Sequence, residues 1–400
     1  MRIIKLMLFI SLILFCTAQA QKFDQLTQTP PMGWNSWNKF GCDVSEELIK
    51  EVADAMVTTG MKDAGYVYLV IDDCWQVARD EAGNIIADPE RFPSGIKALA
   101  DHVHSKGLKF GLYSDAGTNT CQGRPGSRGY EFQDARTYAA WGVDYLKYDW
   151  CNTGTQNAEA SYKLMRDALY QAGRPIVFSI CEWGSNQPWL WAVEIGNLWR
   201  TTGDIQDCWD CQYNWGGMGV VQIIDKQVPI RKYSGPGHWN DPDMLEVGNG
   251  GLTESENRAH FTMWCMLSAP LMAGNDIRTM DQKTLEILTN KEVIALDQDS
   301  LGISAFKFVD YGDREVWVKP LQNGELAFCF LNRGEDDWKV NYPLKKDWLP
   351  DPDFGWKSYP IDGSFTVRDL WKHKNIGRSD KPFQGTIPPH DVVVLCLFKQ

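Results

Sequence analysis

The chain contains 400 residues and carries a formal net charge of −12. This length suggests two domains, because a domain commonly holds about 100–200 residues. The acidic balance argues against a nucleic-acid partner, since a phosphate backbone is bound by a basic surface. The 18 tryptophans are a large number. We expect some of them in the core and others on loops, where tryptophan is common in carbohydrate-active proteins.

The first 20 residues resemble a secretory signal peptide. Arg2 and Lys5 give a basic start, residues 6–15 form a short apolar core, and Ala18-Gln19-Ala20 matches a small-x-small cleavage site. The apolar core is too short to span a membrane comfortably, and we expect no membrane span later in the chain. The sequence therefore predicts an exported protein, periplasmic or secreted, whose 11 cysteines are candidates for disulfides.

Residues 21–300 alternate between strand patterns and helix patterns. Strands are expected to begin near Met32, Tyr66, Lys109, Asp144, Pro175, Asn197, His238 and Pro270. Helices are expected over residues 45–62, 95–106, 131–141, 158–172, 254–267 and 282–289. Eight strands alternating with helices predict an α/β fold, a (β/α)8 TIM barrel. No GxGxxG follows the first strand, which counts against a dinucleotide-binding fold.

The pattern changes after about residue 300. Residues 315–319, 325–330 and 391–396 have strand patterns, and turns rich in Gly, Pro and Asp separate such segments. We therefore expect residues 301–400 to form a C-terminal antiparallel β-sandwich.

Acidic side chains repeatedly follow the strands of the predicted barrel. The run Ile71-Asp72-Asp73-Cys74-Trp75 ends the apolar segment that begins at Tyr66. Other predicted strands lead into Asp115, Asp149, Glu182, Asp204, Asp241 and Asp243. In a (β/α)8 barrel the C-terminal ends of the strands form the active-site face. A single acid there could cap a loop or be solvated, but the repetition predicts a sugar-binding rim of carboxylates and tryptophans.

These motifs resemble those of glycoside hydrolase family 27, which contains the α-galactosidases. The resemblance rests on Met32-Gly33-Trp34-Asn35-Ser36-Trp37, Ile71-Asp72-Asp73-Cys74-Trp75, Leu146-Lys147-Tyr148-Asp149-Trp150-Cys151, Cys181-Glu182-Trp183, Trp199-Arg200 with Asp204, and Trp239-Asn240-Asp241-Pro242-Asp243-Met244. The motifs occur in the family's order and cover the whole barrel. The C-terminal sandwich fits the family by position and pattern only.

The resemblance implies a retaining mechanism with Asp149 as nucleophile and Asp204 as acid/base. Retaining glycosidases use two carboxyl groups about 5–5.5 Å apart. Lys147 lies two residues before Asp149, so both side chains project into the barrel interior, where the lysine charge would keep Asp149 ionised. The alternative for Asp149 is a structural salt bridge with Lys147. Arg200 is similar to the family's substrate-contacting arginine.

The resemblance also implies the sugar pocket. Asp72 and Asp73 match the pair that holds the 4- and 6-hydroxyls of galactose, and Trp37 matches an aromatic wall. Further matching substrate-binding positions are Tyr113, Cys121, Lys147, Cys151, Glu182, Trp183, Arg200 and Asp243. The Gly184-Ser185-Asn186 that follows Trp183 departs from the lysosomal members and is closer to plant and bacterial ones.

The family resemblance implies the pairing of some cysteines, and the sequence leaves the pairing of the others undecided. The resemblance implies disulfides Cys42–Cys74 and Cys121–Cys151. Cys208 and Cys211 form a CxxC with no second CxxC or His pair, which argues against zinc. Cys265 is expected to be a buried free thiol. The pairing stays open for Cys181, Cys208, Cys211, Cys265, Cys329 and Cys396. We expect no cofactor and no metal.

Other activities remain as alternatives. The α-N-acetylgalactosaminidases carry a smaller residue in place of Glu182, and the β-L-arabinopyranosidases alter the pair that matches Asp72 and Asp73, so this sequence favours galactose. Two different classes are a non-catalytic sugar-binding barrel, which the presence of both Asp149 and Asp204 argues against, and a metal-dependent barrel. The expected substrate is an α-galactoside oligo- or polysaccharide. The natural galactoside and the oligomeric state stay open.

Overall fold

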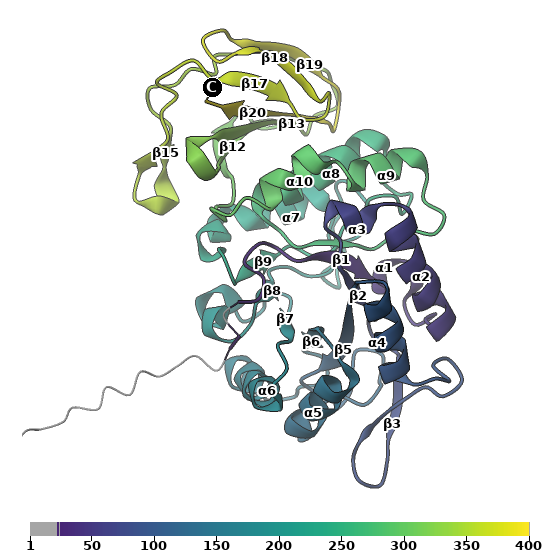
Figure 1. Cartoon of the computed structure of the whole chain (residues 1–400). Helices are drawn as coiled ribbons and strands as arrows, with labels where there is room; N and C mark the ends of the chain where they lie inside the picture. Colours follow the sequence, from purple (N-terminus) through teal and green to yellow (C-terminus); the bar gives the residue numbers. More distant parts are fainter. Residues whose placement is uncertain (1–21, 24, 400) are drawn as a thin grey trace, which may run out of the picture.

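The structure is a computed structural model that describes residues 22–23 and 25–399, so the predicted signal peptide lies outside the described residues. Eight parallel strands form one curled sheet, with helices around its outside (Figure 1). The strands are β1 (Met32–Asn35), β2 (Tyr68–Val70), β5 (Lys109–Asp115), β6 (Tyr145–Asp149), β7 (Val177–Cys181), β8 (Leu198–Arg200), β9 (Trp239–Asp241) and β10 (Leu271–Ala273). The predicted strand starts lie within two residues of these, and the (β/α)8 barrel is confirmed.

The sheet runs in the order β10-β1-β2-β5-β6-β7-β8-β9. Its ring is completed beyond the end of β9, where Leu245 forms a parallel bridge with Ala273. The Leu245 amide donates to the Met272 carbonyl at 2.8 Å, and the Gly274 amide donates to the Leu245 carbonyl at 3.1 Å. The strands are short and almost fully buried because helices cover their outer face, as in other parallel sheets.

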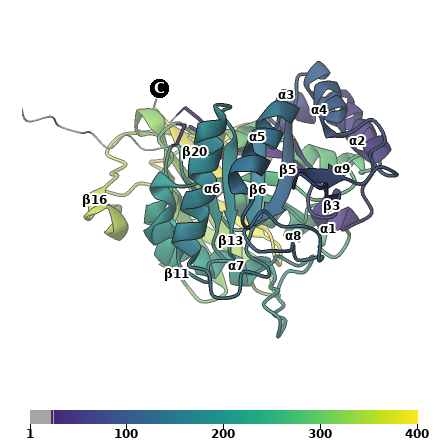
Figure 2. The same ribbon diagram turned by 90° about the horizontal axis from the view of Figure 1, so that it is seen from below.

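The predicted helices form with small changes of boundary. They are α2 (Glu46–Thr58), α4 (Ile96–Ser105), α5 (Glu131–Trp141), α6 (Ala158–Ala172), α8 (Glu254–Leu267) and α9 (Gln282–Leu288). Side-chain caps set several starts: the Ser45 hydroxyl accepts from the Leu48 amide, and Thr253 with Glu256 forms a capping box. α5 and α6 pack side by side over the strands that follow them (Figure 2).

Several elements were not predicted from the sequence. The region expected as one helix over residues 45–62 divides at Gly60 into α2 and α3 (Met61–Ala64). Short helices also form as α1 (Trp37–Phe40), α7 (Val220–Gln227) and α10 (Lys291–Asp297), and a hairpin forms from β3 (Gln76–Arg79) and β4 (Ile85–Ala87). Their 3 to 8 residues are too few for a clear periodicity.

The C-terminal region is the predicted antiparallel β-sandwich. One sheet has the order β11-β12-β13-β20-β17-β18, and β14 pairs with β19 opposite it. The bounds are β11 (Phe306–Asp310), β12 (Arg314–Pro320), β13 (Leu326–Asn332), β14 (Trp338–Tyr342), β17 (Thr366–Asp369), β18 (Lys374–Arg378), β19 (Phe383–Ile387) and β20 (Val392–Phe398), with a small ribbon of β15 (Pro350–Asp351) and β16 (Lys357–Ser358). Phe330 contacts the rings of Trp338, Tyr342 and Phe383 between the layers.

The sandwich packs against the barrel helices rather than against the strand ends. α8 contacts β20, and Arg258 on α8 donates to the Asp391 carboxylate at 2.5 and 2.9 Å. Arg231 forms ion pairs with Asp351 and Asp353. Within residues 22–23 and 25–399, no helix has the length and apolar character needed to cross a membrane.

Candidate active site

A cavity of about 790 Å³ opens at the C-terminal ends of the barrel strands. It is the face on which barrel enzymes carry their active sites. All of the predicted site residues line it except Cys151 and Glu182. Those that line it are Trp37, Asp72, Asp73, Tyr113, Cys121, Lys147, Asp149, Trp183, Arg200, Asp204 and Asp243.

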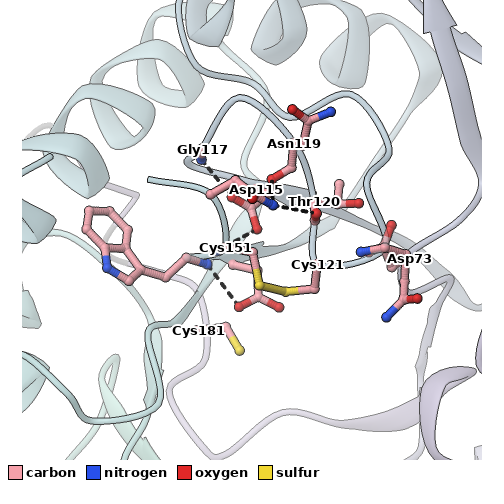
Figure 3. Close-up of a disulfide and its surroundings, with 12 residues drawn as sticks. Asp73, Asp115, Gly117, Asn119, Thr120, Cys121, Cys151 and Cys181 are labelled. Atoms are coloured by element: carbon pink, nitrogen blue, oxygen red, sulfur yellow. Dashed lines mark hydrogen bonds between the residues drawn. A yellow bond between two sulfur atoms is a disulfide. The ribbon is translucent and has the colours of Figure 1, made fainter. Parts of the chain in front are cut away.

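Asp149 is the last residue of β6 and is only 5 % exposed. Its carboxylate accepts a hydrogen bond from the Trp150 amide at 2.9 Å. Asp115, at the end of β5, pairs in register with Asp149 and accepts from the Gly117 and Cys151 amides at 2.6 and 2.9 Å (Figure 3). Backbone donors therefore hold both carboxyl groups in place.

Burial is the main influence on the acidity of this pair. Burial raises the pKa of Asp149 to about 6, while the charge of Lys147 lowers it. Burial, and next the charge of Asp149, raise the pKa of Asp115 to about 9. The negative charge of Asp149 thus disfavours the ionisation of Asp115, while the positive charge of Lys147 favours the ionised form of Asp149.

Lys147 forms its ion pair with Asp72, at 2.8 Å, rather than with Asp149. Its positive charge still lowers the pKa of Asp149. The Asp72 carboxylate also accepts from the Asn35 amide group at 2.8 Å and from the backbone amide of Asp73 at 2.9 Å. The predicted alternative of a direct Lys147–Asp149 salt bridge is therefore wrong.

Asp73 lies beside Asp72 on the cavity floor and is almost fully buried. Its carboxylate accepts from the backbone amides of Cys74, at 2.6 Å, and Gln122, at 3.0 Å. Burial raises its pKa, and hydrogen bonds from the Thr120 side chain and from backbone amides oppose that rise. The two adjacent carboxyl groups thus have fixed positions, with lone pairs left for the hydroxyl groups of a ligand.

Arg200, at the end of β8, joins the two acids on the opposite wall. Its guanidinium lies 3.1 Å from the Asp204 carboxylate and 2.8 Å from that of Asp243. Asp243 is buried and also accepts from the Ile205 amide at 2.8 Å. Asp204 differs from the other acids because its side chain is 44 % exposed. Its carboxyl group is open to solvent, while Arg200 restricts its position.

Comparisons with known proteins identify the family to which the chain belongs. A family model described as "Alpha galactosidase A" matches residues 29–299, and one described as "Alpha galactosidase C-terminal beta sandwich domain" matches residues 311–397. The chain belongs to the α-galactosidase family, glycoside hydrolase family 27. It is therefore a glycoside hydrolase.

Relatives within the family match nearly the whole chain. The chain is 54 % identical over 396 residues to α-galactosidase A of Cellvibrio japonicus (strain Ueda107), covering 97 % of this chain and 96 % of that protein. The crystal structure of α-galactosidase I from Mortierella vinacea has a TM-score of 0.89 at 40 % identity, covering 94 % of this chain and 98 % of that one. A Saccharomyces cerevisiae α-galactosidase with raffinose has a TM-score of 0.87 at 31 % identity, covering 94 % and 99 %.

The disulfides that the family resemblance implied are present. Cys121–Cys151 joins the loop after β5 to the end of β6 (Figure 3), and Cys42–Cys74 joins the loops after β1 and β2. Cys208 and Cys211, whose pairing the sequence left open, form another bridge. Among the described residues the free cysteines are Cys181, Cys265, Cys329 and Cys396, so the expected free thiol of Cys265 is confirmed.

Four acidic and sulfur groups come close enough to suggest a metal site, but two of them are chemically committed. Ligand atoms of Asp115, Cys121, Asp149 and Cys151 lie within 4.8 Å of one another. The two cysteines are bonded to each other and offer no thiolate. Asp115 is held by two backbone amides. This donor set is a poor match to a resident metal.

Glu182 is not among the residues that line the cavity. It is fully buried, and one carboxylate oxygen accepts from the backbone amide and side-chain amide of Asn186 at 2.5 and 2.7 Å. Its other oxygen has no hydrogen-bond partner among the described residues. Burial raises the pKa of Glu182 to about 7. Its predicted contact with the substrate stays a prediction.

Sequence reasoning missed one half of the cavity. Its residues lie in the short helix α1, at the end of β7 and in loops, and they are Asn38, Lys39, Phe40, Gly41, Gln122, Cys181, Ile205, Gln206, Asp207, Trp215, Glu246 and Asn249. The sequence shows Asp115 as an acid at a strand end but does not indicate its role beside Asp149. The spacing of loop residues carries no period, so only their nearness in the chain to predicted site residues such as Trp37, Cys121, Asp204 and Asp243 could have suggested them.

Proposed function

We propose that the protein is a retaining exo-α-galactosidase that removes terminal, non-reducing α-D-galactosyl residues by double displacement. The observation that carries this proposal is the pairing of Asp149 with Asp204 across one cavity. One carboxyl is buried and fixed by the backbone, and the other is half exposed. A retaining glycosidase uses one carboxyl group as nucleophile and the other as proton donor, and we assign the fixed, buried Asp149 to the first role and the more exposed Asp204 to the second.

The first step forms a covalent intermediate. The Asp149 carboxylate attacks the anomeric carbon, the bond from that carbon to the glycosidic oxygen breaks, and Asp204 gives its proton to the leaving oxygen. In the second step Asp204 takes a proton from a water molecule, whose oxygen attacks the anomeric carbon and releases Asp149. Two inversions retain the anomeric configuration, and galactose leaves as the α-anomer.

The surrounding charges suit these roles. The positive charge of Lys147 favours the ionised form that Asp149 needs for attack. Arg200 binds Asp204 from one side and leaves its carboxyl group partly exposed to the cavity and solvent. Asp243 shares the same guanidinium, which limits the motion of Arg200.

The proposed sugar is galactose because the floor of the cavity offers two adjacent carboxyl groups. Asp72 and Asp73 would accept hydrogen bonds from the 4- and 6-hydroxyls. A sugar with a different geometry at C4 would leave a buried carboxylate unpaired, which costs about 1–3 kcal/mol or more. The yeast relative whose structure was solved with raffinose supports an α-galactoside substrate for this chain.

A panel of nitrophenyl glycosides tests the proposal. We expect α-galactoside to be hydrolysed with a higher kcat/KM than α-N-acetylgalactosaminide or β-L-arabinopyranoside, and proton NMR to show α-galactose as the first product. Activity should be unchanged by a chelator. Preference for either other glycoside, release of the β-anomer or loss of activity with the chelator would each contradict part of the proposal. The absence of any turnover would favour the non-catalytic reading.

We further propose that the protein is exported. The Cys121–Cys151 bridge closes a loop of 30 residues and holds the cavity wall beside Asp149. In the chain-entropy model, such a loop gives about 3–4 kcal/mol of stabilisation. Structural bridges of this kind persist in oxidising compartments. Mass mapping of unreduced peptides from natively located protein should find Cys121 linked to Cys151, whereas free thiols at both positions would contradict export and the bridge together.

A further inference from the structure

Asp115 is a buried acid beside the active site that the mechanism above does not use. It is the last residue of β5, is fully buried and does not line the cavity. Carboxylate oxygens of Asp115 and Asp149 lie within 4.8 Å of each other. Burial, and next the charge of Asp149, raise the pKa of Asp115 to about 9, so this is an unfavourable place for an acid. Acids in such positions are often found at functional sites.

One oxygen of Asp115 shapes the turn that follows β5. Its Oδ1 accepts from the Gly117 amide at 2.6 Å, two residues further along the chain (Figure 3). This bond closes the turn and fixes the direction of the Ala116 amide within it. A Cβ at Gly117 would lie 2.0 Å from the Cys151 carbonyl oxygen. The turn therefore packs directly against the backbone that follows Asp149.

The other oxygen of Asp115 holds that backbone. Its Oδ2 accepts from the Cys151 amide at 2.9 Å. The neighbouring Ala116 amide donates to the Asp149 carbonyl at 2.9 Å. The two peptide units after Asp149 are thus both tied to the turn, the first through its carbonyl and the second through its amide.

These ties set the direction of the Trp150 amide, which donates to the Asp149 carboxylate at 2.9 Å. That N–H belongs to the same planar peptide unit as the Asp149 carbonyl, so a bond that fixes the carbonyl also fixes the N–H. The Cys121–Cys151 bridge joins the same two loops through their side chains. The peptide units themselves are oriented by the hydrogen bonds.

An amide side chain could not replace the carboxyl group of Asp115. Amides from two different segments converge on it, and a carboxylate offers each of them an acceptor oxygen. Asparagine has one acceptor oxygen and an NH2 group that can only donate. It would leave one of the two buried amides without a partner and place a donor against it, which pushes the segments apart.

We propose that Asp115 is a positioning residue for the nucleophile, which holds the two peptide units after Asp149 so that the Trp150 amide meets the Asp149 carboxylate. The inference rests on the proposed function and adds a residue to its machinery. Asp115 acts from behind the cavity wall and has no contact with the sugar. Because small displacements of a nucleophile reduce its rate strongly, loss of this restraint slows the chemical step and leaves sugar binding in place.

Asp115→Asn tests the proposal through a comparison of rate with binding. For nitrophenyl α-galactoside, kcat and kcat/KM should fall equally, by about 10²-fold. The inhibition constant of galactose should stay within about threefold of its original value, because the cavity floor with Asp72 and Asp73 is unaltered. A role in folding alone would lower the unfolding temperature without this split between rate and binding.

Asp144→Asn is the matched control. Asp144 directly precedes β6, at the other end of the same pair of strands, and its carboxylate accepts from the Phe110 amide at 2.9 Å. The same chemical change there should lower the unfolding temperature and leave kcat unchanged. The pair of variants therefore separates support of the barrel from support of Asp149.

Gln156→Ala disturbs the same turn more gently and decides the question if Asp115→Asn does not fold. The Gln156 side-chain amide donates to the Ala116 carbonyl at 2.9 Å. Its loss should lower kcat by about threefold, again with little change in galactose binding.

Three outcomes would overturn the proposal. They are an unchanged kcat in the variants that fold, a loss of galactose binding as large as the loss of kcat, and an equal loss of kcat in Asp144→Asn. Failure of the proposed function would look different. In that case the unaltered protein would not hydrolyse the α-galactoside, or Asp149→Ala would stay active.

Discussion

The two walls that carry the proposed catalytic carboxylates are held in different ways. Asp149 ends a strand of five residues with neighbours on both sides, is 5 % exposed, and lies beside a disulfide. Asp204 lies four residues beyond the end of β8, at the start of a loop, and its side chain is 44 % exposed.

The difference follows from what each carboxyl is proposed to do. A nucleophile must meet one carbon atom at one angle, and small displacements reduce its rate strongly. A proton donor must exchange with solvent in every turnover and serve different leaving groups. The strand end that carries Asp149 suits the nucleophile, and the loop after β8 that carries Asp204 suits the proton donor. This contrast predicts which variants will affect all substrates and which will discriminate between them.

The largest loss of activity is expected for substitution of Asp149. Asp149→Ala removes the proposed nucleophile and should reduce turnover by about 10⁴-fold or more on every substrate. Thermal unfolding should still show a folded protein. Azide, entering the vacated space, should restore some activity and give β-galactosyl azide, the inverted product. Asp101→Ala, on the exposed face of α4, is the control with normal turnover. Near-normal activity of Asp149→Ala would remove the nucleophile assignment.

Substitution of Asp204 should reduce kcat/KM by a factor that depends on the substrate. Asp204→Asn cannot protonate the leaving oxygen, so substrates with sugar leaving groups should slow by about 10²–10⁴-fold. For α-galactosyl fluoride, whose leaving group needs little protonation, kcat/KM, which reports the first step, should fall far less. Steady-state kinetics on both substrates measures the difference. Equal losses on the two would contradict the acid/base role.

The cavity floor should control which sugar is chosen. Asp72→Glu places a longer side chain in the space of the C6 group, so the ratio of kcat/KM for nitrophenyl β-L-arabinopyranoside to that for the α-galactoside should rise tenfold or more, about 1.4 kcal/mol. An unchanged ratio would mean that the C6 group is recognised by other residues.

The smallest expected effect is a shift of the pH profile. Asp149 must be ionised to attack, and its pKa is about 6, so kcat/KM should decline as pH falls through that region. Lys147→Met removes a charge that lowers this pKa, so the acidic limb should move to higher pH by about 1 unit or more. Lys345→Met, on the exposed surface of the sandwich, should leave the limb in place. A limb that stays or moves to lower pH in Lys147→Met would contradict this electrostatic role.

The same contrast explains what could be predicted from the sequence. The buried strands are runs of apolar residues that end in acids, so their order, starts and C-terminal carboxylates were visible in the chain. The partner of Lys147 was not, because Asp72 lies 75 residues away and only the curvature of the ring brings the two together. The loop with Tyr213 and Trp215 has no period, and its place beside Asp204 depends on backbone contacts such as that of Gly203 with Gly216.

The way the ring of strands closes has a consequence for local opening. Two backbone hydrogen bonds through Leu245 hold this edge, whereas neighbouring strands elsewhere are paired directly. Asp243, which binds Arg200, lies between β9 and Leu245. Weakly paired edges exchange their amide hydrogens through local fluctuations, before the whole domain unfolds. We expect opening of this edge to release Arg200 from Asp243 while β5 and β6 stay paired, so that the acid/base side of the site loosens first on heating.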